Sequence, residues 1–377
     1  MSNALLYCPD NLPSSINSRL VDNGNGLQMH LLEAGEADEV LLLLHGFPEI
    51  AYSWRKIMPA LAEAGYRVIA PDLRGYGLTT GWDSNYDCDL SLFRPLYVVR
   101  DLLGLLAALD IDHVTMVVGH DYGASIAAYS ALIRPDIFQS LSLMSAPFGG
   151  PPHLKSRESK LDIITDLEQL DRPRKHYQRY YATREANEDM AGSPEGVHDF
   201  LRAYYHYKSA DWPGNKPFEL TSWSAVELAK MPTYYIMDFN KNMADTVALE
   251  MPTAEKIAAC TWLPDEELRV YSDTYTRTGF QGGLNHYRCR FIYEFIGEQQ
   301  LFSNCAIEVP TCFISGESDW GVYQVPGALE AMKKTACVDF RDCHLIEGAG
   351  HWVQQEQPAE VIRHLLAFLA NARNPIK

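Results

Sequence analysis

The segment 117–124, with the sequence Val-Val-Gly-His-Asp-Tyr-Gly-Ala, contains the residues whose types and spacing most directly indicate chemistry. It follows a run rich in β-branched residues and precedes an apolar helical pattern, which predicts a strand, a sharp turn and a helix. The spacing Gly-x-Asp-x-Gly matches the nucleophile elbow Gly-x-Ser-x-Gly, in which flanking glycines permit a strained turn that lifts one side chain clear. Here that side chain is the carboxylate of Asp121. The five residues alone are equally compatible with an ordinary turn that contains an aspartate.

A carboxylate at the elbow restricts the reactions that the site can perform. It needs no base to become a nucleophile, and its attack on an ester would produce a reactive anhydride. Its natural targets are saturated carbons, as in an epoxide or an alkyl halide, where attack yields an alkyl ester of Asp121.

Two later loops supply an acid and a histidine in the order that this kind of site requires. The loop 315–320 and the loop 347–352 each follow an apolar strand-like run. Nucleophile, acid and histidine is the chain order of an elbow-type triad. We therefore predict His351 as the general base and Asp319 as the acid that orients it, with Glu317 as the alternative acid.

A loop early in the chain could stabilise an oxyanion. The sequence His45-Gly46-Phe47-Pro48-Glu49 directly follows the apolar run 40–44. The backbone N–H of Phe47, together with that of Tyr122 after the nucleophile, could form an oxyanion hole. The alternative is an ordinary strand-end turn with a packed histidine. Side chains of these loops should also line the substrate site: His45, Pro48, Trp320 and Trp352.

The arrangement of apolar runs predicts the scaffold that positions these loops. Strand-like and helical patterns alternate through the first part of the chain and again after about residue 310, which indicates an α/β fold with a doubly wound, mostly parallel sheet. In such sheets the ligand lies at the carboxyl ends of the strands. The rhythm stops in the Tyr-rich, helical stretch 150–290. We interpret 1–149 and 291–377 as a core domain and 150–290 as an inserted helical cap.

The expected strands, in chain order, are two within 17–34, then 40–44, 67–71, about 113–118, 141–145 and 310–315. The expected helical stretches of the first part are about 52–64 and about 92–109.

Composition excludes several classes of partner and cofactor. The 377 residues include 32 basic and 49 acidic ones, and the net charge of −17 disfavours nucleic acid and anionic membranes and suits a small neutral substrate. Eight cysteines without Cys-x-x-Cys spacing indicate reduced packing residues of a cytoplasmic protein. The start of the chain lacks a signal-peptide pattern, and no apolar run of about 18 residues predicts a membrane span.

No dinucleotide, phosphate-loop or zinc-helix motif is found, and the spacing of Cys337, Cys343 and His344 fits no usual zinc pattern. We therefore expect neither a cofactor nor a metal, and a monomer or a homodimer.

Several motifs together resemble one family. The segments 45–49, 72–77, 119–124 and 348–352 are similar to those of soluble epoxide hydrolases and their haloalkane and haloacetate dehalogenase relatives, and the similarity extends over about 15–370. The resemblance implies the α/β-hydrolase fold with an inserted cap. It also implies a cis peptide bond at Phe47-Pro48, which a bond before proline tolerates.

Two cap segments favour epoxides within this family. His176-Tyr177-Gln178 and the segment 279–288 resemble those that supply the paired lid tyrosines of epoxide hydrolases, which implies this part for Tyr177 and Tyr287. Opening an epoxide creates an alkoxide, and phenols of pKa about 10 can protonate it at neutral pH. Haloalkane dehalogenases bind the departing halide with a Trp at the position of Tyr122, and haloacetate dehalogenases bind the substrate carboxylate with arginines, which segment 122–130 lacks. Both differences favour an epoxide.

The resemblance thus implies a cofactor-independent epoxide hydrolase that acts on a small apolar epoxide and water. A haloalkane or haloacetate dehalogenase is the alternative reaction, and a non-catalytic ligand receptor on a hydrolase fold is the alternative of another class. The sequence does not identify the epoxide or the ring carbon attacked.

Overall fold

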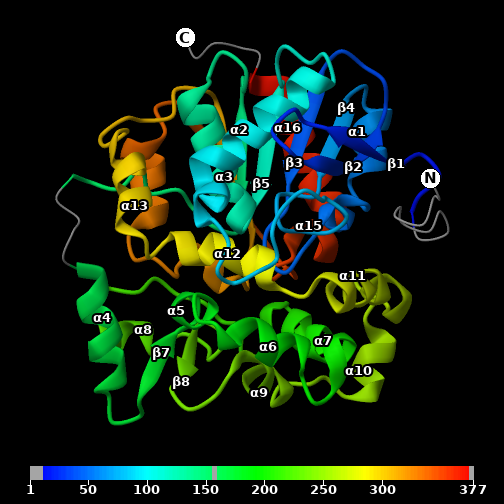
Figure 1. The fold of residues 1–377 in the computed structure, drawn as a ribbon. Helices are drawn as coiled ribbons and strands as arrows, with labels where there is room; N and C mark the ends of the chain where they lie inside the picture. Colours follow the sequence, from blue (N-terminus) through cyan, green and yellow to red (C-terminus); the bar gives the residue numbers. More distant parts are fainter. Residues whose placement is uncertain (1–11, 155–158, 373–377) are drawn as a thin grey trace.

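The computed structural model describes residues 12–154 and 159–372. An eight-stranded sheet runs through the upper half of the molecule, and a layer of helices lies below it (Figure 1). Within the described ranges no helix is long and apolar enough to cross a membrane. Residues 1–10, which include Cys8 and lack a signal-peptide pattern, lie outside the described ranges. The described cysteines are free thiols, and Cys305 is exposed rather than packed as predicted.

The main sheet has the strand order β1-β2-β4-β3-β5-β6-β9-β10. β1, β2 and β4 pair antiparallel, and every other neighbouring pair is parallel. The central strands β3 and β5 are buried along their whole length, as expected where helices cover both faces of a parallel sheet. The prediction of a doubly wound, mostly parallel sheet is confirmed. Its strands are β1 (Asn17–Asp22), β2 (Gln28–Ala34), β3 (Val40–Leu44), β4 (Arg67–Pro71), β5 (Met116–His120), β6 (Leu141–Met144), β9 (Thr311–Gly316) and β10 (Phe340–Ile346).

The chain reverses direction across the sheet at β3, and this reversal places the site. From β3 it passes to β4 on one side and then to β5 on the other, so right-handed crossovers place α1 (Met58–Glu63) and α2 (Pro95–Ala108) on opposite faces. α3 (Tyr122–Ile133) packs with α2, and α16 (Pro358–Ala372) packs with α1. A crevice for ligand is expected at the carboxyl ends of β3 and β5, where the order reverses.

The helix expected over about 92–109 begins only at Pro95, because proline is favoured in the first helical turn and excluded from a helix interior. The shorter helical elements of the core are η2 (Ala51–Trp54), η3 (Leu90–Phe93), η4 (Trp320–Val322), α14 (Ala328–Ala331), η5 (Met332–Ala336) and α15 (Val353–Glu356).

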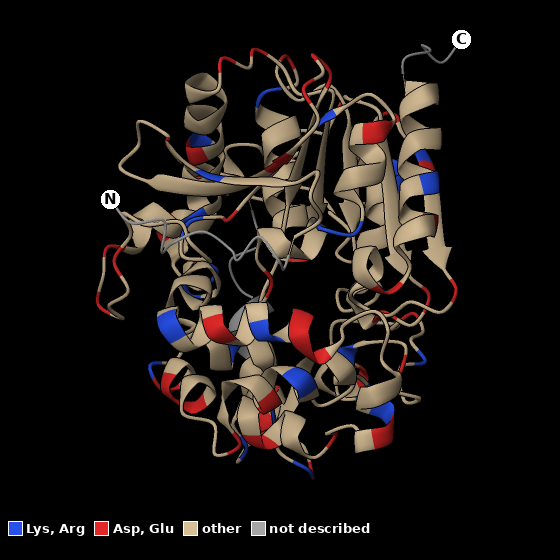
Figure 2. Ribbon diagram, turned by 90° about the vertical axis from the view of Figure 1, so that its right-hand side faces the viewer, with Lys and Arg blue, Asp and Glu red and all other residues tan. Residues whose placement is uncertain are grey.

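The middle of the chain forms the helical layer below the sheet. A short antiparallel pair, β7 (Arg174–His176) and β8 (Ile236–Asp238), lies among its helices. α12 (Gln281–Cys289) runs along the boundary between the layers, and α13 (Tyr293–Gln300) lies beside the upper layer (Figure 1). On the side that Figure 2 shows, basic and acidic residues alternate along the lower helices. The helices of the lower layer are α4 (Ser159–Glu168), α5 (Tyr177–Tyr181), α6 (Glu185–Ala191), α7 (Gly196–Lys208), α8 (Ala225–Leu228), α9 (Met243–Ala248), α10 (Ala254–Ala259) and α11 (Asp265–Thr278).

Candidate active site

The elbow between β5 and α3 holds Asp121 in a backbone conformation that L-residues rarely adopt, with φ 51° and ψ −116°. The flanking glycines are required by close backbone contacts. A Cβ on Gly119 would lie 2.2 Å from the carbonyl oxygen of Gly123, and a Cβ on Gly123 would lie 2.2 Å from that of Leu44. The spacing Gly-x-Asp-x-Gly is therefore imposed by the packing of the turn against itself and against β3.

The Asp121 carboxylate is buried and held by groups that favour its charge. Its Oδ1 accepts a hydrogen bond of 3.0 Å from the N–H of Phe47, and its Oδ2 lies 3.5 Å from Nε2 of His351. Burial alone would raise the pKa of Asp121, but His351, Lys208 and His120 lower it well below its usual value. The carboxylate is therefore ionised at neutral pH, as a nucleophile that has no base of its own must be.

Asp319 orients His351. Nδ1 of His351 lies 3.0 Å from Oδ1 of Asp319, which also accepts a hydrogen bond from Gly321 N–H (2.7 Å). Burial raises the pKa of Asp319, but the His351 imidazole and the hydrogen bond from Gly321 N–H lower it overall. Asp319 is therefore a carboxylate, and it favours a proton on Nδ1 of His351. Nε2, on the other side of the ring, then faces Asp121. Glu317 is exposed, and the geometry favours Asp319 as the partner.

Ser145 is a member of this cluster that the sequence analysis missed. Its Oγ lies 2.8 Å from Nδ1 of His351, and its backbone has a φ of 68°. Ser145 follows β6, which lies between the strand of the elbow and the strand that precedes Asp319. The only signal in the sequence was this position at the carboxyl end of a strand.

A second buried pair fixes the backbone of His351 and was also missed. His120 Nδ1 lies 2.6 Å from Oε2 of Glu49, and its Nε2 lies 2.7 Å from the carbonyl oxygen of His351. Because a carbonyl can only accept, Nε2 donates, and the carboxylate favours a second proton on Nδ1. Burial lowers the pKa of His120, but Glu49 raises it overall. The Nε2 atoms of Gln354 and Gln355 complete the shell of Glu49, each at 2.9 Å.

One of the two predicted oxyanion donors contacts the Asp121 carboxylate directly. The Phe47 N–H already points at it, and the Phe47-Pro48 bond is cis as expected. Tyr122 is the first residue of α3, so helix hydrogen bonding leaves its N–H free. Among the described residues the Tyr122 hydroxyl is buried without a hydrogen-bond partner.

The two lid tyrosines face each other above the elbow. Their ring centroids are 6.0 Å apart, and the Tyr287 ring lies 5.7 Å from that of Phe47. Burial, followed by the charge of Asp121, raises the pKa of both phenols, so both stay protonated at neutral pH. The Tyr177 hydroxyl accepts from Nε2 of Gln178 at 3.0 Å and donates to Oε1 of Gln324 at 3.3 Å. Within the described residues the Tyr287 hydroxyl has no such partner.

The residues predicted to line the substrate site have mostly other contacts. Leu73 N–H donates to Nε2 of His45, and Nδ1 of His45 therefore donates to Gly46 O, so the His45 imidazole has no nitrogen left for a ligand. The His45 ring therefore supports the loop, and a substrate contact of His45 stays a prediction. The hydroxyl of Tyr205 donates to Pro48 O at 3.2 Å.

The two tryptophans of the predicted lining are also buried. Trp352 Nε1 donates to the carbonyl oxygen of Tyr205 at 2.8 Å, and its ring lies 4.6 Å from that of His351. Trp352 therefore supports the base. Trp320 packs against Phe218 with ring centroids 5.0 Å apart, and within the described residues its Nε1 has no partner.

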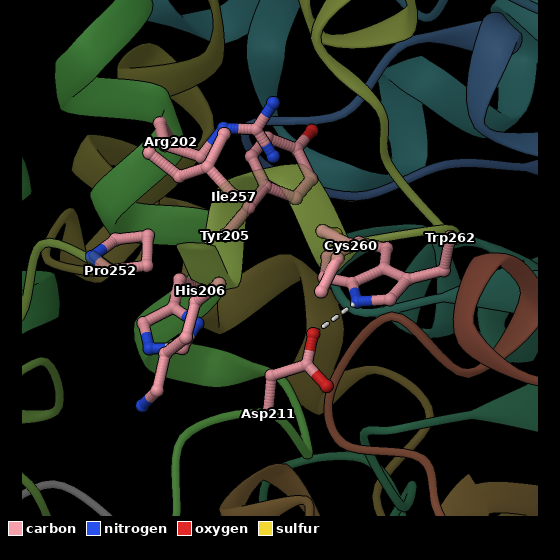
Figure 3. Close-up of a pocket in the computed structure, with 10 residues that line it drawn as sticks. Arg202, Tyr205, His206, Asp211, Pro252, Ile257, Cys260 and Trp262 are labelled. Carbon is pink, nitrogen blue, oxygen red and sulfur yellow. Dashed lines mark hydrogen bonds between the residues drawn. The ribbon is translucent and has the colours of Figure 1, made fainter. Parts of the chain in front are cut away.

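A separate pocket of about 240 Å³ lies in the cap between α7 and α10. None of the predicted catalytic residues lines it. Trp262 Nε1 donates to Asp211 Oδ2 at 2.7 Å on one side of it (Figure 3). Tyr205 is shared, because its ring borders this pocket while its hydroxyl reaches Pro48. We assign the pocket no part in the chemistry at Asp121.

Comparison with known proteins agrees with this geometry. The alpha/beta hydrolase fold family matches residues 39–187. Epoxide hydrolase A of Mycobacterium tuberculosis is 32% identical over 361 residues, which cover 93% of this chain and 96% of that protein. This chain belongs to the epoxide hydrolase family. Epoxide hydrolase 3 of Siraitia grosvenorii is also 32% identical, over 353 residues that cover 92% of this chain and 96% of that protein.

Solved epoxide hydrolases share the whole fold. The enzyme from an endophytic Streptomyces superposes with a TM-score of 0.78 at 30% identity, covering 97% of this chain and 98% of that one. Potato (Solanum tuberosum) epoxide hydrolase I gives a TM-score of 0.72 at 33% identity, covering 94% and 99%. The predicted α/β-hydrolase fold is therefore confirmed over nearly the whole chain.

Proposed function

We propose that this member of the epoxide hydrolase family converts an epoxide to a vicinal diol through a covalent ester of Asp121. The observation that carries the proposal is an ionised carboxylate at the elbow, faced by two protonated phenols and backed by an Asp319-oriented imidazole. Each of these three features serves a different step.

In the first step Asp121 attacks a ring carbon while the bond from that carbon to the ring oxygen breaks. The oxygen takes a proton from Tyr177 or Tyr287, and the resulting phenolate is stabilised by the other phenol. The phenols are needed because the epoxide oxygen stays attached to the product after the ring opens, so its negative charge must be neutralised by a proton. A halide, in contrast, departs with its charge. This need favours the epoxide over the dehalogenase alternatives, which provide for a departing halide.

In the second step His351 Nε2 takes a proton from water, and the oxygen of that water attacks the carbonyl carbon of the Asp121 ester. The tetrahedral oxyanion accepts hydrogen bonds from the N–H groups of Phe47 and Tyr122. Collapse releases the diol oxygen as an alkoxide, and the proton held on His351 neutralises it. Asp121 is left as a carboxylic acid and loses its proton to solvent, and the phenolate of the first step gains a proton from solvent, which restores the enzyme.

Other parts of the proposal rest on sequence patterns. We infer that 150–290 is the cap and that 1–149 with 291–377 is the core domain. A cytoplasmic monomer or homodimer that acts without a cofactor or a metal, with a small apolar epoxide and water as substrates, remains the prediction. The receptor alternative is disfavoured because nucleophile, acid and base are all present.

The origin of the added oxygen tests the covalent route. In a single turnover with enzyme in excess, run in ¹⁸O water, the diol should emerge unlabelled, because its new oxygen comes from Asp121. The label should appear in the peptide that contains Asp121 and reach the product only in later turnovers. Label mainly in the diol of the first turnover would refute the ester and show direct attack by water.

A further inference from the structure

Lys208, the last residue of α7, is a cation buried among aromatic rings. Its side chain is only 3% exposed. Its Nζ lies 5.0 to 5.8 Å from four ring centroids, those of Tyr204, Tyr234, Tyr235 and Trp352. Aromatic faces attract an ammonium, but they do not accept its three N–H groups as an oxygen does.

A buried lysine is ordinarily paired with a carboxylate or hydrogen-bonded, since burial of an unpaired charge is costly. Within residues 12–154 and 159–372, Nζ of Lys208 makes no hydrogen bond and no ion pair within 4.0 Å. Within the described residues the direct contacts of this ammonium are therefore with rings, and the carboxylates of Asp121, Asp319 and Glu49 act on it from beyond hydrogen-bond distance. An acceptor supplied by a ligand would complete its surroundings.

The ammonium lies beside the candidate catalytic residues rather than on the outer side of the cap. The carbonyl oxygen of Lys208 accepts from the N–H of His351 at 2.9 Å. Tyr235, which contacts the ammonium, also packs against Tyr177 with ring centroids 5.2 Å apart. Asp121 is close enough for the two charges to perturb each other, without an ion pair within 4.0 Å. Lys208 thus lies between the base and a lid phenol.

We propose that Lys208 determines specificity by binding a carboxylate carried by the epoxide, so that the preferred substrates are epoxides of carboxylic acids. The inference rests on the proposed function at Asp121. The aromatic rings would contact the carbon body, and the ammonium would pair with the carboxylate on the cap side. The expectation of a neutral substrate considered only the net charge of −17, whereas Lys208 places a single cation among these rings, with Asp121, Asp319 and Glu49 as the nearby carboxylates.

Two epoxides of matched skeleton test the inference. trans-3-Phenylglycidate carries a carboxylate where trans-β-methylstyrene oxide carries a methyl group. The measured quantity is kcat/KM for the anion divided by kcat/KM for the neutral compound, compared between variants, so that intrinsic reactivity cancels. Lys208→Met should lower this ratio about 10- to 100-fold, the range of one charged hydrogen bond, mainly through KM of the anion.

Two further variants separate charge from packing. Lys208→Arg keeps the charge and should retain most of the ratio, and Lys216→Met removes an exposed lysine of the cap and should leave the ratio unchanged. A ratio that Lys208→Met does not move, or a loss shared equally by both epoxides in the methionine and arginine variants, would overturn the inference. If neither epoxide yields diol with the unaltered enzyme, the proposed function itself fails.

Discussion

Replacing His351 by glutamine should separate the two proposed steps. Glutamine keeps an amide near Asp121 and Asp319 but cannot take a proton from water. Asp121 would retain the hydrogen bond from Phe47 N–H, so the first step loses only the weak 3.5 Å contact with Nε2. Loss of about one neutral hydrogen bond, about 1 kcal/mol, slows alkylation about fivefold. Loss of the general base slows hydrolysis of the ester about 10²–10⁴-fold.

The alkyl ester should therefore accumulate in the variant, and intact-protein mass spectrometry should show one substrate mass added after mixing with epoxide. Peptide mapping should place the added mass on Asp121. The matched control is His113→Gln, because His113 is exposed and outside the site, and it should turn over without accumulating an adduct. A His351→Gln protein that is inactive and remains unmodified would refute the proposal that Asp121 forms the ester and His351 acts only in its hydrolysis.

Three further outcomes follow from the same geometry. Tyr287→Phe should slow alkylation more than Tyr177→Phe, because the Tyr177 hydroxyl already donates a hydrogen bond to Gln324. Stopped-flow alkylation rates in the reverse order would contradict this reasoning. Ser145→Ala should slow hydrolysis of the ester about 5- to 10-fold, the effect of one hydrogen bond, with little change in alkylation. Burial lowers the pKa of Lys208, so its charge, and the preference for an anionic epoxide, should fade on raising the pH before pH 10.5 is reached, which a pH profile of the two kcat/KM values would show.

The turn that carries Asp121 could be predicted from sequence because its geometry demands particular residues. The contacts around Gly119 and Gly123 leave no room for a Cβ, so the pattern in the chain directly reports the turn. The same holds for the fully buried strands, whose continuous apolar runs reflect cover on both faces. The positions of the loops directly after their strands then predicted that they meet at the carboxyl edge of the sheet.

The choice between the two acids and the part of Ser145 could not be read from the chain. Glu317 and Asp319 stand two residues apart in one loop, and only the folded loop shows that one is exposed while the other reaches His351. In the sequence nothing distinguishes Ser145 from other small residues that follow a strand. Only the pairing of β6 with β9 brings it next to the loop of Asp319. The partners of His45 could not be predicted for a related reason, because one is the following glycine and the other is Leu73, beyond the next strand.

Lys208 was missed because its surroundings come from distant segments of the chain. The rings around its ammonium belong to α7, to the segment before β8 and to the loop after β10. No local pattern distinguishes this lysine from the exposed ones of the cap. The net charge of −17 gave no indication of this lysine either, since a sum over the chain carries no information about the sign of one buried group.

The backbone of the base is held from the cap and from the core at once. The N–H of His351 donates to the carbonyl oxygen of Lys208, and its carbonyl oxygen accepts from Nε2 of His120. Glu356 adds a second tie, because its Oε2 accepts from the N–H groups of both Ala210 in the cap and Gly350 beside the base. A displacement of the cap would therefore shift the base and the proposed substrate cation together. In the proposed reaction ester formation uses Tyr177 and Tyr287 and ester hydrolysis uses His351, so we expect both steps to depend on these contacts between the helical layer and the His351 loop.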